Sequence, residues 1–202
     1  MAQERDPFTY TPQYVYEHHV FVGSGLPKPV IPPCIDDHKA IKATTTSSSI
    51  VVITYDDGCQ QTRILGTLSW RNNNPGNITL HSTDSRAHGA IGFNKSGRDI
   101  FAIYPDEQTG FNAIVSQLKE SDYQRYTLGN MIKVKYAPPN ENDSAAYAAF
   151  VSQKTSIPEN QPMTSLSEEQ LQNIASAIKE YEGWRPGKVI WKKEGSASCV
   201  QK

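Results

Sequence analysis

The spacing of apolar residues changes once along this chain, near Tyr104, and this change constrains the fold more than any other feature. Before it, β-branched and aromatic residues gather in short runs such as residues 50–53, which is typical of strands. After it, Phe111, Ile114 and Leu118 recur at helical spacing, on one helix face. We therefore predict an α+β protein whose strands come first.

Three more helices are expected after the first. The second is short, and the third is capped by Asn142 or Asp143, because their side-chain oxygens accept from free N–H groups at a helix start. The fourth has the clearest limits. Ser167 and Gln170 fit a capping box, and Gly183 is a typical helix stop.

The length of 202 residues suits one domain with an appendage. We expect a β-rich N-terminal extension over residues 1–68, a mostly helical core with a small β region over residues 69–190, and a C-terminal tail over residues 191–202. In the extension, the pair Asp57-Gly58 predicts a hairpin turn, and the Thr/Ser run at residues 44–49 is typical of a loop.

Charge and hydropathy exclude several classes of protein. The formal net charge is -1, and no Lys/Arg run is dense enough for phosphate-backbone binding, so nucleic acid is not expected as a partner. No apolar stretch approaches the roughly 20 residues that span a bilayer, and the polar start is unlike a secretory signal peptide. We expect synthesis in the cytoplasm without such a signal.

The three cysteines allow two interpretations. Cys34 and Cys59 could form a disulfide in an oxidising compartment, or all three, Cys199 included, could be buried thiols. Cys59 with His81 or His88 could also be a thiol peptidase pair, although catalytic cysteines usually begin a helix.

No metal and no cofactor are expected. The cysteines lack metal-type spacing. His18-His19 and residues 36–38 could be drawn together as a zinc site, but neighbours on a strand point to opposite faces.

The loop at residues 71–78 reads Arg-Asn-Asn-Asn-Pro-Gly-Asn-Ile. Asparagine competes for backbone hydrogen bonds and proline lacks a donor, so this composition is poor for a helix or a central strand. Each asparagine offers two donors and one acceptor. The loop either ties down neighbouring backbone or presents amides to the hydroxyl and N-acetyl groups of a sugar.

Several motifs in one order resemble a domain found in phage virion proteins and type VI secretion effectors. They are WRNNNPGNI at residues 70–78, GAIG at 89–92, FAIY at 101–104, GFNA at 110–113 and YAPPNENDS at 136–144, with Tyr147 and Glu182-Gly183 beyond. The resemblance covers about residues 69–190. Members of that group are regarded as cell-wall hydrolases, so the resemblance implies bacterial peptidoglycan as the substrate.

The end of the fourth helix resembles the catalytic helix of lysozyme-like enzymes, in which Glu closes the helix just before Gly or Ser. This implies a lysozyme-like core in permuted order, acting as a muramidase or a lytic transglycosylase. Glu182 is the expected general acid, because partial burial beside an aromatic ring raises a carboxyl pKa. Glu141 is the expected second carboxylate, and Asp143 is either an assistant or only a helix cap. The alternative for Glu182 is a solvated helix end.

The expected glycan contacts come from the loop and from two aromatic rings. They are Arg71, Asn72, Asn73, Asn74, Asn77, Tyr147 and Trp184. Two other functions stay open: a peptidoglycan amidase or endopeptidase, and a glycan-binding virion or baseplate component without catalysis.

Delivery by a type VI secretion or phage-like apparatus is the expected route to the periplasm of target bacteria. An antibacterial effector of this kind needs a cognate immunity protein in the producing cell, so that protein and a component of the apparatus are the expected protein partners.

Overall fold

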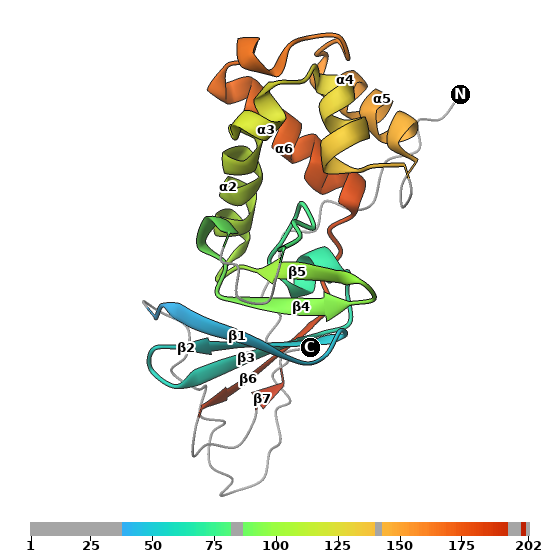
Figure 1. Ribbon diagram of the computed structural model, residues 1–202. Coiled ribbons are helices and arrows are strands. Elements are labelled where there is room, and N and C mark those ends of the chain that lie inside the picture. Colours follow the sequence, from blue (N-terminus) through green and yellow to red (C-terminus); the bar gives the residue numbers. More distant parts are fainter. Residues whose placement is uncertain (1–37, 82–86, 140–142, 194–198, 201–202) are drawn as a thin grey trace, which may run out of the picture. The chain divides into compact units, whose positions relative to one another are not determined.

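The computed structural model describes residues 38–81, 87–139, 143–193 and 199–200 (Figure 1). All of the described residues belong to one compact unit within residues 32–202. Helices and strands are both present, and the α+β class is confirmed. Residues 1–37 of the predicted N-terminal extension lie outside the described part.

A five-stranded antiparallel sheet joins both ends of the described chain. Its strand order is β1-β2-β3-β6-β7. The strands are β1 (Ala40–Ser47), β2 (Ile50–Tyr55), β3 (Cys59–Ile64), β6 (Lys188–Lys193) and β7 (Cys199–Val200). The predicted boundary at residue 190 therefore falls inside β6, a strand that pairs with β3.

Two expectations for the first strands had different outcomes. The hairpin turn is confirmed, since Gly58 has a φ of 82° and its N–H donates to Tyr55 O at 3.1 Å. The loop predicted over residues 44–49 is wrong, because Thr44 and Thr45 lie in β1 and pair with β2. Threonine is β-branched and suits a strand, and only residues 48 and 49 form the turn.

A second, two-stranded sheet packs against the first. It consists of β4 (Gly92–Ser96) and β5 (Asp99–Ile103). The backbone N–H of Ala43 in β1 donates to Ile91 O at 3.0 Å. Ile103 is fully buried in a small apolar cluster together with residues of β1 and β2.

The helical region follows the predicted order. Its α-helices are α2 (Glu107–Leu118), α3 (Ser121–Gln124), α4 (Leu128–Asn130), α5 (Ser144–Thr155) and α6 (Glu168–Glu182), and α1 (Leu68–Arg71) precedes them. A π-helix (Met131–Tyr136) continues α4, and two 3₁₀ turns cover Ala87–Gly89 and Met163–Ser165. The four predicted helices correspond to α2, to α4 with its π-helix, to α5 and to α6.

The predicted limits of α6 are confirmed. The Ser167 side chain accepts from Gln170 N, and Gln170 Oε1 accepts from Ser167 N, which completes the capping box. Gly183 follows the last helical residue with a φ of 74°. The helix therefore stops directly after Glu182.

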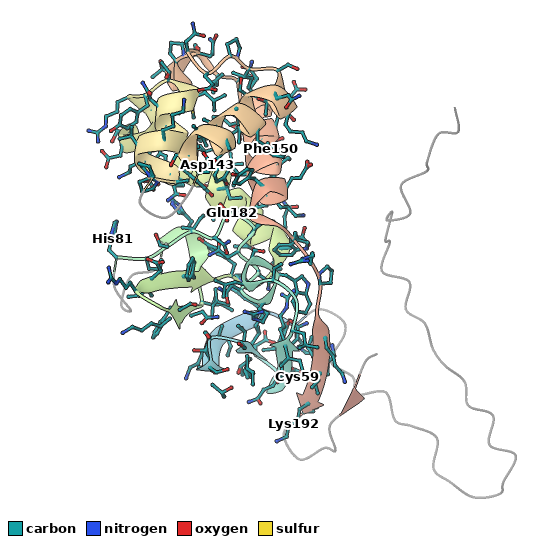
Figure 2. All side chains as sticks on the ribbon, turned by 90° about the vertical axis from the view of Figure 1, so that its right-hand side faces the viewer. Cys59, His81, Asp143, Phe150, Glu182 and Lys192 are labelled. Carbon is teal, nitrogen blue, oxygen red and sulfur yellow. The ribbon has the colours of Figure 1, made fainter. Side chains whose placement is uncertain are left out.

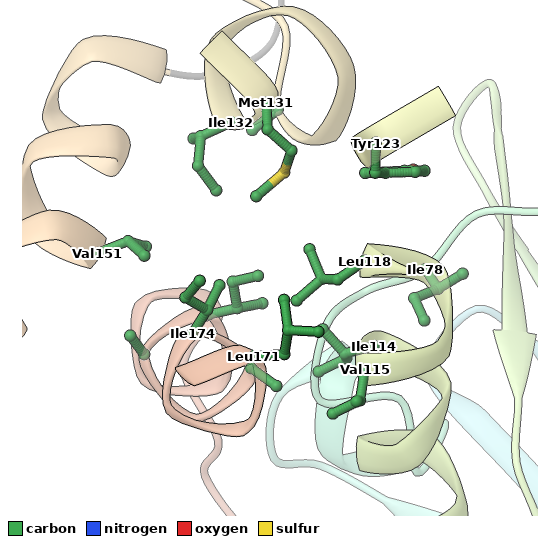
Figure 3. Packing of buried hydrophobic residues seen from close by; sticks show 14 of the residues in the cluster. Ile78, Ile114, Val115, Leu118, Tyr123, Met131, Ile132, Val151, Leu171 and Ile174 are labelled. Carbon is green, nitrogen blue, oxygen red and sulfur yellow. The ribbon is translucent and has the colours of Figure 1, made fainter. Parts of the chain in front are cut away.

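The main apolar core lies between α2, α5, α6 and the π-helix (Figure 3). Ile114 and Leu118 of α2 meet Ile174 of α6, and all three are fully buried. Burial of this stripe supplies most of the stability of such helices. No helix in the described part of the chain is long and apolar enough to cross a membrane.

Candidate functional site

The asparagine loop begins with a buried turn. Asn74 is fully buried, and its Nδ2 donates to the carbonyl oxygens of Ile78 at 2.9 Å and Ala102 at 3.0 Å. Its Oδ1 accepts from Ile78 N at 2.8 Å. One side chain therefore closes the turn and ties it to β5.

Asn73 and Asn72 are buried in the same way. Asn73 Nδ2 donates to Tyr104 O at 3.1 Å, and its Oδ1 accepts from the buried guanidinium of Arg63. Asn72 Oδ1 accepts from Asn94 Nδ2 at 2.9 Å. Like Asn74, these side chains serve the protein's own structure.

Arg71 also bonds to its own chain, since its guanidinium donates to Gly66 O at 2.7 Å and Ser48 O at 3.3 Å. Direct sugar contacts were predicted for Arg71, Asn72, Asn73 and Asn74, and in this structure each of these side chains is hydrogen-bonded to other groups of the protein. Most of their hydrogen-bonding groups are directed at protein partners, whereas Arg71 Nε and Asn72 Nδ2 are buried without a hydrogen-bond partner among the described residues.

Close approach of α2 to the loop depends on a glycine. A Cβ at Gly110 would collide with the carbonyl oxygen of Asn73 and come within 2.8 Å of Pro75 Cδ. The GFNA motif therefore contains the one residue type that allows α2 and the loop to touch.

The last asparagine of the loop differs, because its side chain bonds to a carboxylate. Asn77 Nδ2 donates to Glu182 Oε2 at 2.9 Å, and Tyr147 Oη donates to Glu182 Oε1 at 2.8 Å. We call Asn77, Tyr147 and Glu182 the Glu182 cluster. It joins the loop, α5 and the end of α6, and Figure 2 shows Glu182 well away from Cys59. The fold thus brings together three of the predicted site residues.

The carboxyl of Glu182 has an altered proton affinity. Burial raises its pKa above the ordinary value, and the hydrogen bonds from Asn77 and Tyr147 partly oppose this. The pKa of Tyr147 is raised much further, chiefly by burial and then by the charges of Tyr136 and Glu182. Tyr147 therefore stays a hydroxyl donor, and Glu182 is the group of the cluster that titrates.

Aromatic rings surround the Tyr147 side of the cluster. Tyr147 stacks on Tyr181 with ring centroids 3.8 Å apart, and Tyr136 meets it edge-on at 6.2 Å. Tyr136 Oη also donates to Gly76 O at 2.8 Å. The sequence analysis missed Tyr136 and Tyr181 as site residues. The available signals were the place of Tyr136 in the resembling motif and of Tyr181 beside Glu182.

Asp143, the other predicted acid that the structure describes, has a different partner from Glu182. Asp143 Oδ1 accepts from Ala146 N at 3.0 Å, so Asp143 is the N-cap of α5. Glu141 lies outside the described residues. Within the described part, no carboxylate other than that of Glu182 is hydrogen-bonded to Asn77 or Tyr147.

Trp184 lies beside a shallow hollow. Lys179 Nζ is 5.0 Å from the centroid of its ring. Trp184, Lys179, Ser176 and Glu180 line a hollow of about 450 Å³. Glu182 is not among these lining residues, so the structure does not join Trp184 to the cluster.

Cys59 offers no free thiol for a peptidase, because it is disulfide-bonded and 1% exposed. Cys34, its predicted partner, lies outside the described residues. His88, one of the two histidines considered with Cys59, instead lies 3.0 Å from Glu120.

A histidine and two aspartates gather at the edge of the five-stranded sheet. His38 Nδ1 lies 3.2 Å from Asp56 Oδ1, and His38 Nε2 lies 3.5 Å from Asp57 Oδ2. Lys193 Nζ also lies 3.5 Å from Asp57 Oδ2. The lysine already supplies a cation to this group, so it is a weak candidate for a metal site.

Comparisons with known proteins add little to this geometry. No family model and no curated protein matches the chain. One similar solved structure is that of the MutM (Fpg) protein from Thermus thermophilus. It is 12% identical, with a TM-score of 0.30, and the match covers 72% of this chain and 59% of that chain. A similarity this weak carries no argument about fold or function.

Proposed function

We propose that this protein cleaves the glycan strand of bacterial peptidoglycan, with Glu182 as the general acid. The observation that carries the proposal is the Glu182 cluster: a carboxyl group with a raised pKa, held between Tyr147 and Asn77 at 2.8 and 2.9 Å. A general acid must keep its proton near the working pH, and burial shifts Glu182 in that direction. The substrate class rests on the resemblance of residues 69–190.

In the proposed reaction, Glu182 gives its proton to the glycosidic oxygen while the bond from that oxygen to the sugar C1 breaks. In a muramidase, water then attacks the electron-poor C1 and gives its proton to a carboxylate. In a lytic transglycosylase, a hydroxyl of the same sugar attacks C1 and gives its proton to the Glu182 carboxylate that the first step left. The second route needs one acid only, which agrees with the single carboxylate in the described cluster. Glu141, outside the described residues, is the candidate second carboxylate for the muramidase route.

The lysozyme-like core in permuted order belongs to the same proposal. Its support is the chain order of the described elements, in which the loop and the β4–β5 pair come before a last helix that ends on Glu182. The proposed site of action is the periplasm of target bacteria after delivery by a type VI or phage-like apparatus. The disulfide at Cys59 agrees with an oxidising compartment.

The proposed immunity protein has a direct test. The chain should be toxic when targeted to the periplasm of a sensitive cell, and a small partner encoded beside it should neutralise that toxicity. Absence of both effects would argue against an effector role and leave glycan cleavage as a separate question.

Glu182→Gln is the decisive substitution for catalysis. The amide keeps the size of the side chain, and its Oε1 can still accept from Tyr147. Its Nε2 can donate to Asn77 Oδ1 after a flip of the Asn77 amide, because this oxygen is buried without a hydrogen-bond partner in the part of the chain that the structure describes. We expect muropeptide release from purified sacculi to fall about 10²–10⁴-fold, the usual contribution of a general acid.

Glu180→Gln is the matched control, because Glu180 is an exposed neighbour on the same helix. If Glu182→Gln retains full activity in a folded protein, the catalytic assignment is wrong. Mass spectrometry of the products identifies the bond. An anhydro sugar end indicates a transglycosylase, a reducing end a muramidase, and a cut peptide stem an amidase or endopeptidase. Binding without any product indicates a glycan-binding component.

A further inference from the structure

We propose that Thr67 and Ser69 form a clamp that positions Glu182 by holding the chain segment directly after it. Thr67 caps the short helix α1, and Ser69 lies in its first turn. The sequence analysis identified neither residue as a candidate for the site. The inference rests on the proposed function of Glu182, because it assigns these two residues a positioning role for that side chain.

The clamp consists of hydrogen bonds to residues 183–185. Ser69 Oγ donates to Gly183 O at 2.7 Å, and Ser69 is 1% exposed. Thr67 N donates to Arg185 O at 3.0 Å, and Arg185 N donates to Thr67 Oγ1 at 3.1 Å. The two hydroxyl oxygens lie 2.9 Å apart. The backbone leaving α6 is therefore bonded on both sides of Trp184.

This clamp continues the pairing of the large sheet. The β3–β6 ladder ends at the pair Ile64 and Lys188, and the two chains stay in contact beyond it. A Cβ at Gly66 would lie 2.6 Å from Gly187 N and 2.7 Å from Arg185 O. The five-stranded sheet is thus connected through residues 64–69 to the end of α6.

A carboxylate on the last residue of a helix needs such support. The last turn of a helix has carbonyl groups without partners inside the helix and frays easily. Gly183, with a φ of 74°, adds backbone freedom directly after Glu182, because glycine adopts many backbone conformations. Asn77 and Tyr147 hold the Glu182 side chain, and the clamp fixes the backbone from which that side chain extends.

Loosening the clamp has two expected consequences. Glu182 moves relative to the substrate, and a small displacement in an active site lowers kcat more than KM. Water also reaches the carboxyl, and since burial is what raises its pKa, that pKa falls toward the ordinary value. A merely structural serine would produce neither effect.

Ser69→Ala is the test, and Ser152→Ala is its matched control. Ser152 Oγ donates to Ile157 O at 2.7 Å near the end of α5, so both variants lose a serine bond to a backbone carbonyl near a helix end, and Ser69→Ala also loses the contact with Thr67 Oγ1. We expect Ser69→Ala to lower kcat on sacculi about tenfold or more and to lower the pKa of Glu182, measured by ¹³C NMR titration of its carboxyl. Ser152→Ala should change neither.

The clamp is refuted if Ser69→Ala matches Ser152→Ala in both kcat and the carboxyl titration. The titration needs no activity, so it still decides about the clamp if the wild-type protein fails to cleave peptidoglycan and the proposed function is wrong. Where Ser69→Ala does not fold, Thr67→Val replaces it. Thr67→Ser should then restore the wild-type titration, because it keeps the hydroxyl that accepts from Arg185, and failure to restore it counts against the clamp.

Discussion

Asn74 and Asn77 lie three positions apart in one loop, yet their amides have different partners. Asn74 is fully buried, and its three hydrogen bonds go to backbone groups of the protein. Asn77 is half-buried and donates to the carboxylate of Glu182, while its Oδ1 has no hydrogen-bond partner among the described residues. The first asparagine maintains the shape of the loop, and the second connects that shape to a titratable group.

This difference separates two demands on a loop of this kind. A turn of polar residues inside a protein must satisfy its own hydrogen-bonding groups, since unpaired buried groups are costly. Only a residue at the margin of such a turn can direct its side chain to something else. Asn77, with a φ of 47°, lies at that margin, and asparagine tolerates this left-handed conformation better than most residues.

The largest expected effect is on stability and belongs to the buried asparagine. Asn74→Ala leaves Ile78 and Ala102 with unpaired backbone groups, which should reduce the free energy of unfolding by about 2–4 kcal/mol. Asn77→Gly removes the other amide without straining the left-handed backbone, and should cost less than about 1 kcal/mol. Urea denaturation of both variants measures the difference.

Asn112→Ala provides the baseline, because Asn112 is exposed on α2 and accepts a surface hydrogen bond from Gln108. Equal losses for Asn74→Ala and Asn77→Gly would remove the distinction between the two asparagines. The effects on activity should have the opposite order, because Asn77→Gly should lower kcat in a protein that stays folded.

The helices could be predicted from the sequence because their signals are local. The capping box of Ser167 and Gln170 and the stop at Gly183 depend on neighbours within a few residues. The C-terminal strand could not be predicted in this way, since β6 is defined by its pairing with β3, more than one hundred residues away. A predicted tail beyond residue 190 was therefore part of a sheet.

For the candidate site, the sequence singles out the proposed acid more readily than the residues that support it. Glu182 could be selected from its place before Gly183 and beside aromatic residues. The burial of Asn72 and Asn73 could not be predicted, because their partners Asn94 and Tyr104 come later in the chain. A polar residue in a sequence does not show whether its amide faces solvent or the interior.

A smaller effect concerns the pH dependence of stability. Because burial raises the pKa of Glu182 above 4.5, the folded protein binds this proton more tightly than the unfolded chain. The resulting stabilisation is complete below pH 4.5 and is lost as pH rises through the folded pKa. Glu182→Gln does not titrate, so we expect its Tm to exceed that of the wild type by a few degrees at pH 7 and the gap to close toward pH 4.

Calorimetry across that pH range measures the effect, with Glu180→Gln as the exposed comparison. A gap that is constant with pH would mean that the two hydrogen bonds to the carboxylate cancel the effect of burial on its pKa, and a lower Tm for Glu182→Gln at pH 7 would mean that they outweigh it. That result would place Glu182 with the buried asparagines, as a group retained for structure.

The smallest expected effect comes from the Tyr147 hydroxyl. Its hydrogen bond favours the ionised carboxylate and so lowers the pKa of Glu182. Tyr147→Phe keeps the ring and its stacking on Tyr181 but removes this bond, so the pKa of Glu182 should rise. Because the proposed acid works in its protonated form, the alkaline limb of the pH–activity profile should move to higher pH. Tyr126→Phe is the control, since it also removes a tyrosine hydroxyl but its ring contacts Arg125. An alkaline limb that moves to lower pH in Tyr147→Phe would contradict the roles assigned to Tyr147 and Glu182.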